Sequence, residues 1–353
     1  MCRTANGGDI WFKNSFEKNL KAWINDETLY DDIISGCQKD GRGNICPVTI
    51  ILPTLAMEAK EYIEKKTENP TKEEYKKAFI DLLTKKIHEA KDMLIERFEH
   101  IASQSAASAK FMYGNKTMSG YVPEEGIQSA LRHGTIVIGK IGLAEALIIL
   151  IGKDHSIKEG MEFAKEIETL YRDLCAKFKE EYKFNFGNYN TPAESLCHTS
   201  LKKFRDKYGI IPNVSDKEYF TNSIHIPVHN NNINIFEKIN KEAELTGYSS
   251  AGCITYVEMD SSAVNNIDAM EKIVTYAMDK DIPYFALNFD LNRCAKCNYQ
   301  GGDINDVCPK CGSQDILELK RVTGYLSTTK KHFNPGKIDE VDHRCKHESK
   351  TIL

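Results

Sequence analysis

The fold of this chain is indicated by one stretch near its C-terminus, Arg321-Val322-Thr323-Gly324-Tyr325-Leu326. Taken alone, Gly324 would be an ordinary turn glycine, because glycine tolerates a positive φ that other residues avoid. Two pairs of cysteines lie just upstream of the stretch and set it apart from an isolated turn glycine.

The cysteine pairs are Cys294 with Cys297 and Cys308 with Cys311, each separated by two residues. Two such pairs place four thiolates within tetrahedral reach of one ion, as in zinc ribbons. Zn²⁺ is the expected ligand because it is redox-inert, and an iron site of the same spacing is the alternative. Four thiolates close the coordination sphere, so we expect a structural metal that fixes the approach to the Gly324 loop.

The overall composition excludes several classes of protein. A net charge of −4 over 353 residues gives no general nucleic-acid-binding surface. The apolar run at 136–151 contains Gly139, Lys140, Gly142 and Glu145, so it indicates a buried strand and helix and no membrane span. No secretory signal is visible, and eleven cysteines without a disulfide-type context indicate a reducing, cytoplasmic compartment.

The apolar patterns predict strands that mostly alternate with helices, which is typical of a parallel α/β fold. A capping box at Thr71 and Glu74 opens a long helix, and Gly139 and Gly142 allow close packing between a strand and a helix. The rival interpretation of these two glycines is a nucleotide-phosphate turn, for which the spacing is a weak signal. Strands are expected at 45–53, 133–141, 184–187, 219–228, 249–258 and 283–289, and helices at 71–112, 142–151, 157–183, 233–245 and 267–278.

Arg-Val-Thr-Gly-Tyr at 321–325 resembles the glycyl-radical loop of glycyl radical enzymes. The resemblance implies a stored radical on Gly324, which glycine suits because, without a Cβ, its α-carbon can become planar and share the unpaired electron with both flanking amides. Together with the cysteine cluster, the stretch resembles the anaerobic (class III) ribonucleoside-triphosphate reductases. The resemblance extends over essentially the whole chain and implies part of a ten-stranded α/β barrel. It implies the C-terminal part of the catalytic barrel at 1–289, a four-cysteine zinc-binding segment at 290–320, and the glycyl-radical loop with the C-terminal tail at 321–353.

Two further catalytic residues come from the same resemblance. Met1-Cys2-Arg3-Thr4 matches the family segment whose cysteine becomes the substrate-attacking thiyl radical, which makes Cys2 the candidate. The match also implies that this chain corresponds to the C-terminal half of the usual enzyme. Asn44, in Gly41-Arg42-Gly43-Asn44, matches an asparagine beside the reacting sugar and the formate reductant. From the residues alone, Asn44 would be a turn asparagine.

Substrate contacts are expected where a helix begins after a barrel strand. Thr191 suits an N-cap, Pro192 the first helical position, and Glu194 completes a capping box facing its own cap. The free N–H groups of such a helix end can hold a triphosphate, and the family has Thr-Pro-Ala-Glu in the matching place. His225 is expected to be structural, and the 334–347 tail to be polar and solvated. The residues assigned to the substrate are Thr191, Pro192, Ala193, Ser195, Asn222 and Ser223.

The resemblance implies an oxygen-sensitive oxidoreductase that makes deoxyribonucleotides for DNA replication. A separate activase with S-adenosylmethionine and a 4Fe-4S cluster removes hydrogen from Gly324, the glycyl radical oxidises Cys2, and the thiyl takes the ribose 3′ hydrogen. Water then leaves C2′, and formate is the reductant in the common subtype. The implied partners are the activase, a ribonucleoside triphosphate, a complementary N-terminal half and a second copy in a homodimer. The resemblance also implies ATP binding.

Two rivals to this assignment remain. One is another glycyl radical enzyme, against which the cysteine cluster and the Cys2 to Asn44 pattern weigh. The other is a non-catalytic or split fragment that needs a complementary N-terminal chain. Unpaired strand edges would then make the isolated chain sticky or dependent on a partner.

Overall fold

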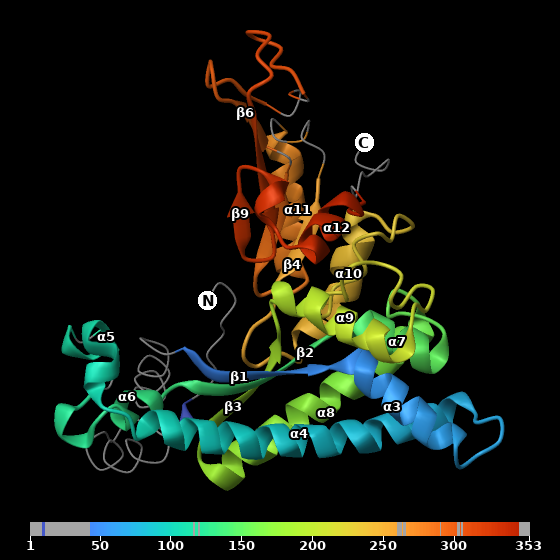
Figure 1. The fold of residues 1–353 in the computed structure, drawn as a ribbon, viewed down its shortest axis with the longest axis vertical. Helices are drawn as coiled ribbons and strands as arrows, with labels where there is room; N and C mark the ends of the chain where they lie inside the picture. Colours follow the sequence, from blue (N-terminus) through green and yellow to red (C-terminus); the bar gives the residue numbers. More distant parts are fainter. Residues whose placement is uncertain are drawn as a thin grey trace.

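The computed structural model describes residues 9–10, 43–115, 117–118, 121–259, 263, 266–289, 291–301, 304 and 306–345. Figure 1 shows a parallel sheet lying across long helices, with the C-terminal strands standing above the opposite face of the sheet. The expected α/β architecture is confirmed. Within the described ranges, no helix is both long enough and apolar enough to cross a membrane.

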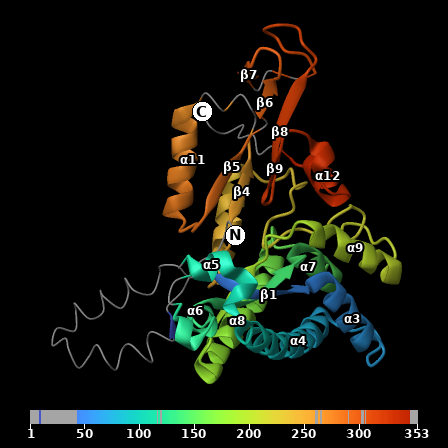
Figure 2. The same ribbon diagram turned by 60° about the vertical axis from the view of Figure 1, so that its left-hand side comes forward.

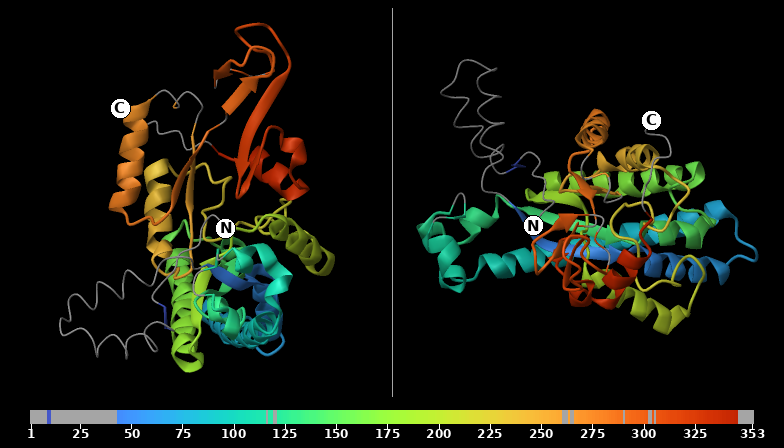
Figure 3. Two further views of the ribbon diagram at one scale, coloured as in Figure 1. Left: turned by 90° about the vertical axis from the view of Figure 1, so that its left-hand side faces the viewer. Right: turned by 90° about the horizontal axis from the view of Figure 1, so that it is seen from above.

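The first sheet has three parallel strands in the order β1-β2-β3. Its central strand β2 is buried along its whole length, as expected for a parallel sheet with both faces covered. Figures 1 and 3 show the long helices on the face away from the C-terminal strands. The strands are β1 (Asn44–Ile51), β2 (Thr135–Ile141) and β3 (Asn185–Asn190), and the main covering helices are α3 (Leu52–Glu64), α4 (Lys72–Ala102), α7 (Leu143–Ile151) and α8 (Lys158–Tyr182).

Helix α4 begins as the sequence predicts, because Thr71 and Glu74 form the capping box. It ends at Ala102, however, so the prediction of a helix to about residue 112 was wrong. The Ser103 hydroxyl donates to the His100 carbonyl, and Ser105 caps the next turn. Such side chains compete with the helical hydrogen bonds and end the helix. A 3₁₀ turn (Ala106–Ala109) and the short α5 (Lys110–Gly114) follow, and α6 (Gln128–Leu131) precedes β2.

A second parallel sheet pairs β4 (Thr255–Glu258) with β5 (Phe285–Asn288). Helices α10 (Ile235–Thr246) and α11 (Ile267–Asp279) pack against it, within two residues of the expected bounds. The loop before β4 joins the two sheets, because the Ala251 N–H donates to the Asn188 carbonyl at 3.0 Å. The described strands therefore supply five parallel strands in two sheets. Closure into a ten-stranded barrel remains a prediction.

The strand expected at 219–228 is absent, and the segment is a buried loop after α9 (Ser195–Tyr208). Alternation of Ile224 and Ile226 suggested a strand, and both side chains are buried. The backbone of this loop bonds to carboxylates instead of to a neighbouring strand: Thr221 donates to Glu145 and Ile226 to Glu242. The strand expected from residue 249 begins only at residue 255, because 249–252 is the loop that contacts β3.

The C-terminal part is an antiparallel sheet in the order β7-β6-β8-β9, followed by α12 (Pro335–Asp342). Figure 2 shows α11 on one flank of β4 and β5 and α12 on the other. The prediction of a solvated tail was wrong, since Lys337 is fully buried and Glu340 nearly so. The strands are β6 (Leu291–Cys294), β7 (Gln300–Gly301), β8 (Ile316–Val322) and β9 (Tyr325–Ser327).

One buried acid links the first sheet to the loop at 219–228. Glu145, in the first turn of α7, accepts hydrogen bonds from the Thr221 N–H at 2.7 Å and the Thr221 hydroxyl at 2.6 Å. Burial raises the pKa of Glu145 from 4.5 to about 7, although the hydrogen bonds from Thr221 oppose the shift. The stability that this proton contributes is fully present below pH 4.5 and is lost as pH rises through about 7.

We predict that Glu145→Gln removes this pH dependence, because Gln can accept the same hydrogen bonds without ionising. The wild type should lose stability relative to the variant as the pH rises. Its free energy of unfolding, minus that of the variant, should fall by on the order of 3 kcal/mol between about pH 4.5 and pH 8. Urea unfolding followed by circular dichroism at each pH measures it. Glu180→Gln, at a carboxylate 70% exposed on α8, is the control and should leave the profile unchanged. Parallel profiles for wild type and Glu145→Gln would contradict the prediction.

Candidate active site

Gly324 lies in the two-residue turn between β8 and β9, because Val322 pairs with Tyr325 across the hairpin. The left-handed conformation in this turn belongs to Thr323, whose φ is 56°. The φ of Gly324 lies outside the left-handed region. A β-branched residue rarely adopts a positive φ, whereas glycine does so freely. Conformational freedom in the turn therefore does not explain why glycine is at position 324.

The Glu194 carboxylate lies close to the α-carbon of Gly324. A Cβ on Gly324 would lie 2.6 Å from the Glu194 Oε1, so the end of this flexible side chain would have to shift to make room for it. The Tyr325 hydroxyl is also hydrogen-bonded to Glu194, which raises the pKa of Tyr325. The Glu194 carboxylate thus faces the turn. The expectation that it faces its own helix was wrong.

The expected capping box at Thr191 was also wrong. Helix α9 begins at Ser195, and the residue in the N-cap position is Glu194, without a capping hydrogen bond from its side chain. The Thr191 hydroxyl is instead 3.0 Å from the Thr49 hydroxyl of β1. A Cβ on Gly139 would meet Thr191 Oγ1 at 2.0 Å, so the glycine allows the segment to cross the sheet closely. Pro192 lies partly buried within this segment.

The Asn222 amide joins this segment to the Gly324 turn. Its Nδ2 donates to the Ala193 carbonyl at 2.8 Å and to the Thr323 hydroxyl at 3.1 Å, while its Oδ1 accepts from the Ala193 N–H at 2.9 Å. The neighbouring Ser223 is buried with φ 55° and an Oγ that has no partner among the described residues. The structure therefore brings Ala193 and Asn222 together against the turn, with Ser195 exposed at the start of α9.

Asn44 lies farther from the turn. It opens β1, in register with Thr135 and Asn185 at the start of the other strands, and its Nδ2 donates to the Ala251 carbonyl at 2.9 Å. Thr191 follows the opposite end of β3, a strand length of about 17 Å away. Among the described residues, the Asn44 Oδ1 is buried without a partner. Cys2 lies outside the described residues.

Two residues at this site were missed by the sequence interpretation. Glu194 was noticed only as a helix cap, although a carboxylate beside a proposed phosphate site was a signal. The Tyr256 hydroxyl, on β4, donates to the Thr323 carbonyl at 3.1 Å. No sequence pattern distinguishes Tyr256 from the other aromatic residues that lie on strands. His225, expected to be structural, is buried with Nδ1 3.3 Å from the Glu242 carboxylate.

The four predicted metal ligands converge at the far end of the C-terminal sheet, where all four sulfurs lie within 4.8 Å of one another. Cys294 is 3.6 Å from Cys311 and Cys297 is 3.6 Å from Cys308. These separations are too long for disulfides, whose sulfurs lie about 2.05 Å apart. Tetrahedral zinc with bonds of about 2.3 Å places its sulfurs about 3.8 Å apart, so the geometry fits zinc.

The backbone around the cysteines also fits a metal site. Each pair is followed by a residue in the left-handed region, Asn298 with φ 60° and Gly312 with φ 70°, which closes a tight knuckle. Backbone N–H groups, chiefly that of Cys297, lower the pKa of Cys294 to about 6, whereas the neighbouring cysteines raise the pKa of Cys311 to about 12, so without an ion the cluster shares a proton. A lowered pKa favours the thiolate form that binds metal.

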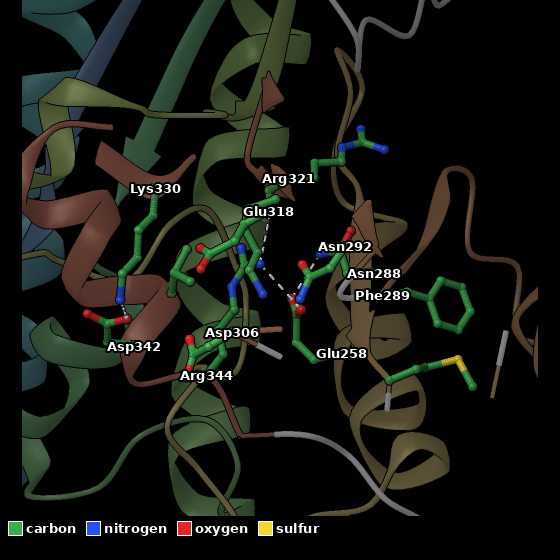
Figure 4. A pocket seen from close by; sticks show the side chains of 13 residues that line it. Glu258, Asn288, Phe289, Asn292, Asp306, Glu318, Arg321, Lys330, Asp342 and Arg344 are labelled. Carbon is green, nitrogen blue, oxygen red and sulfur yellow. Dashed lines mark hydrogen bonds and ion pairs between the residues drawn. The ribbon is translucent and has the colours of Figure 1, made fainter. Parts of the chain in front are cut away.

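A cavity of about 690 Å³ lies beside the turn, between the ends of β4 and β5 and the C-terminal sheet (Figure 4). Its walls are charged with both signs, and Gly324 is not among the residues that line it. Lys330 pairs with Asp342 at 2.9 Å, and Arg344 pairs with Glu258 at 3.3 Å. Two of its cations are therefore already paired with acids, which makes it a poor site for a triphosphate.

Known proteins resemble this chain along most of its length. The model of the family described as "Anaerobic ribonucleoside-triphosphate reductase" matches residues 2–347. Proteins of that name from Salmonella typhimurium and Enterobacteria phage T4 are each 29% identical to this chain, over 87% and 88% of its length. The chain spans 43% and 49% of these two relatives, which is less than half of each.

Solved structures show the same fold. A structure described as "Anaerobic ribonucleotide reductase" superposes with a TM-score of 0.65 and 21% identity, covering 88% of this chain and 46% of that one. The Thermotoga maritima anaerobic ribonucleotide reductase in complex with dATP and CTP gives a TM-score of 0.61 and 21% identity, covering 81% and 43%. Because the family model spans nearly all of its sequence, this chain belongs to the anaerobic ribonucleoside-triphosphate reductase family.

Proposed function

We propose that this chain is the radical-bearing catalytic half of an oxygen-sensitive ribonucleoside-triphosphate reductase. The observation that carries the proposal is the environment of Gly324. The glycine is not required by the left-handed turn, and the Glu194 carboxylate beside it is the end of a flexible side chain that can shift. Because neither the backbone nor the packing requires glycine here, its presence in a chain of this family supports chemistry at its own α-carbon.

The proposed reaction begins at Gly324. A separate activase, with S-adenosylmethionine and a 4Fe-4S cluster, removes a hydrogen atom from this α-carbon. The resulting radical takes the hydrogen atom of the Cys2 thiol, and the thiyl then removes the ribose 3′ hydrogen of a ribonucleoside triphosphate. Water leaves C2′, and formate supplies the electrons near Asn44. Deoxyribonucleotides for DNA synthesis are the product.

We assign the substrate to the segment that crosses the sheet beside the turn. Thr191, Pro192 and Ala193 precede α9, Ser195 opens it, and Asn222, next to Ser223, bonds both Ala193 and Thr323 of the turn. Nucleotides are supported as the class of ligand by the Thermotoga maritima relative, which is described in complex with dATP and CTP. Glu194 adds a carboxylate in contact with the turn, so we give it a role at the active site in place of helix capping.

A complementary N-terminal chain is the proposed partner. Within the described residues, β1 is an edge strand of its sheet, with no second neighbour. An apolar groove of about 520 Å³ lies beside it, lined in part by Val48, Ile50, Leu55 and Met93. Exposed strand edges of this kind favour pairing with another chain. We place the intact enzyme in the cytoplasm as a homodimer, with the activase as a transient partner.

We predict that Gly324→Ala abolishes radical formation, because the added methyl group would meet the Glu194 Oε1 and crowd a planar α-carbon. Anaerobic electron paramagnetic resonance after incubation with reduced activase and S-adenosylmethionine measures it. The chain is tested alone and with a cognate N-terminal half, and nucleotide turnover is assayed wherever a doublet appears. Gly247→Ala is the matched control, since that glycine caps α10 with φ −65° and open space around its Cα.

The wild type and Gly247→Ala should give a glycyl doublet that Gly324→Ala lacks. Absence of a doublet in the wild type under both conditions would refute the proposed function and leave a folded fragment of the family. A doublet that persists in Gly324→Ala would place the radical elsewhere.

We also predict that the cysteine cluster holds zinc and that the ion is needed to present the Gly324 turn. Strand β8 runs directly from the cluster to the turn, so loss of the ion should loosen the strand. Elemental analysis of the wild type should find zinc instead of iron. The zinc should be lost in Cys297→Ser and kept in the control Cys345→Ser, because Cys345 lies outside the cluster. Chelation should lower the radical yield. An undiminished doublet in fully chelated protein would contradict the structural role of the metal.

A further inference from the structure

The turn that contains Gly324 adopts a conformation its sequence does not favour. Thr323 is β-branched, has φ 56° and is only 3% exposed. β-Branched residues avoid this region, so surrounding contacts must hold the residue there. A group that holds the Thr323 carbonyl also fixes the peptide plane between Thr323 and Gly324.

Two side chains from different parts of the fold contact Thr323. The Asn222 Nδ2 donates to its hydroxyl at 3.1 Å, and the Tyr256 hydroxyl donates to its carbonyl at 3.1 Å. Only the second contact is made to the peptide group that joins Thr323 to Gly324. That peptide is one of the two amides with which a radical on Gly324 would share its spin.

Tyr256 is itself held firmly on β4. Its ring lies 5.3 Å from that of His225, and the Arg321 guanidinium is 5.7 Å from the ring centre. Glu258, two residues along and therefore on the same face of the strand, pairs with Arg344 at 3.3 Å. Arg344 in turn donates to the Arg321 carbonyl at 2.8 Å. β4 thus holds two carbonyls of the radical hairpin, those of Arg321 and Thr323.

We infer that Tyr256 is a positioning residue for Gly324: its hydroxyl holds the Thr323 carbonyl and so sets the plane of the peptide next to the radical carbon. Only the radical at Gly324 in this inference rests on the proposed function. The contact that holds the turn exists in the chain whether or not a radical forms.

Tyr256→Phe tests the assignment because it removes the hydroxyl and keeps the ring. Hydrogen exchange in the full, unactivated chain should become roughly threefold to tenfold faster for the hairpin amides at 320–327, as expected for one lost hydrogen bond. Tyr276→Phe is the matched control, since its hydroxyl donates to Asn240 at 2.8 Å on another pair of helices. Unchanged exchange in Tyr256→Phe, or an equal increase in Tyr276→Phe, would overturn the assignment.

A second variant distinguishes a specific contact that positions the turn from a general contribution to the stability of the fold. Thr323→Gly relieves the unfavourable conformation, so Tyr256→Phe should have a smaller effect on hairpin exchange in that background than in the wild type. Equal effects in both backgrounds would mean that Tyr256 stabilises the fold without holding the turn.

The activated protein gives a third measurement. The splitting of the Gly324 doublet should differ between Tyr256→Phe and the wild type and stay the same in Tyr276→Phe. Identical splitting in all three would overturn the inference that Tyr256 sets the peptide plane. A wild type without any doublet refutes the proposed function instead, and the exchange result then still decides whether Tyr256 holds the turn.

Discussion

The site depends on one side-chain amide, that of Asn222, which makes three hydrogen bonds between the parallel sheet and the C-terminal hairpin. Two of them fix Ala193, in the segment that follows β3, and the third fixes Thr323. Asn222 is 7% exposed, so these bonds form where water competes little and where an unpaired amide would be costly. The separation between the proposed substrate segment and Gly324 is therefore set by the Asn222 side chain together with the contacts of Glu194 to Gly324 and Tyr325.

The hairpin is fixed at both of its ends. At one end four cysteines come together with the spacing of a tetrahedral metal site. At the other end Tyr256 bonds to the carbonyl of Thr323, in the turn, and Arg344 bonds to that of Arg321, on β8. Between these ends β8 pairs with β6 over residues 316–319 and with β9 over residues 320–322. Each half of the strand therefore has one paired neighbour, and the position of Gly324 follows mainly from the contacts at the two ends.

The sequence predicted those parts of the fold in which local pattern and tertiary environment agree. Runs of β-branched residues became β2, which is fully buried, and β1, which is mostly half-buried and not buried as expected. The Thr71 capping box opened α4, and the cysteine spacing gave the convergent cluster. The failures share a cause. Thr191 and the 219–228 loop have the local signals of a cap and a strand, but their polar groups bond to Thr49, Glu145 and Ala193, which are distant in sequence. Glu194 was assigned to its own helix for the same reason: its partner, the Gly324 turn, lies far along the chain.

The contact between Arg344 and the Arg321 carbonyl also has a consequence for biosynthesis. Arg344 lies 23 residues after the strand that it holds, so the ribosome makes it after the glycine turn is complete. Its guanidinium is only 14% exposed and also pairs with Glu258 on β4. During translation the hairpin is therefore made before this contact is possible, and it gains the contact only after the segment that follows α12 has been synthesised. Changes that remove or displace Arg344 should then act on a glycine that they never touch.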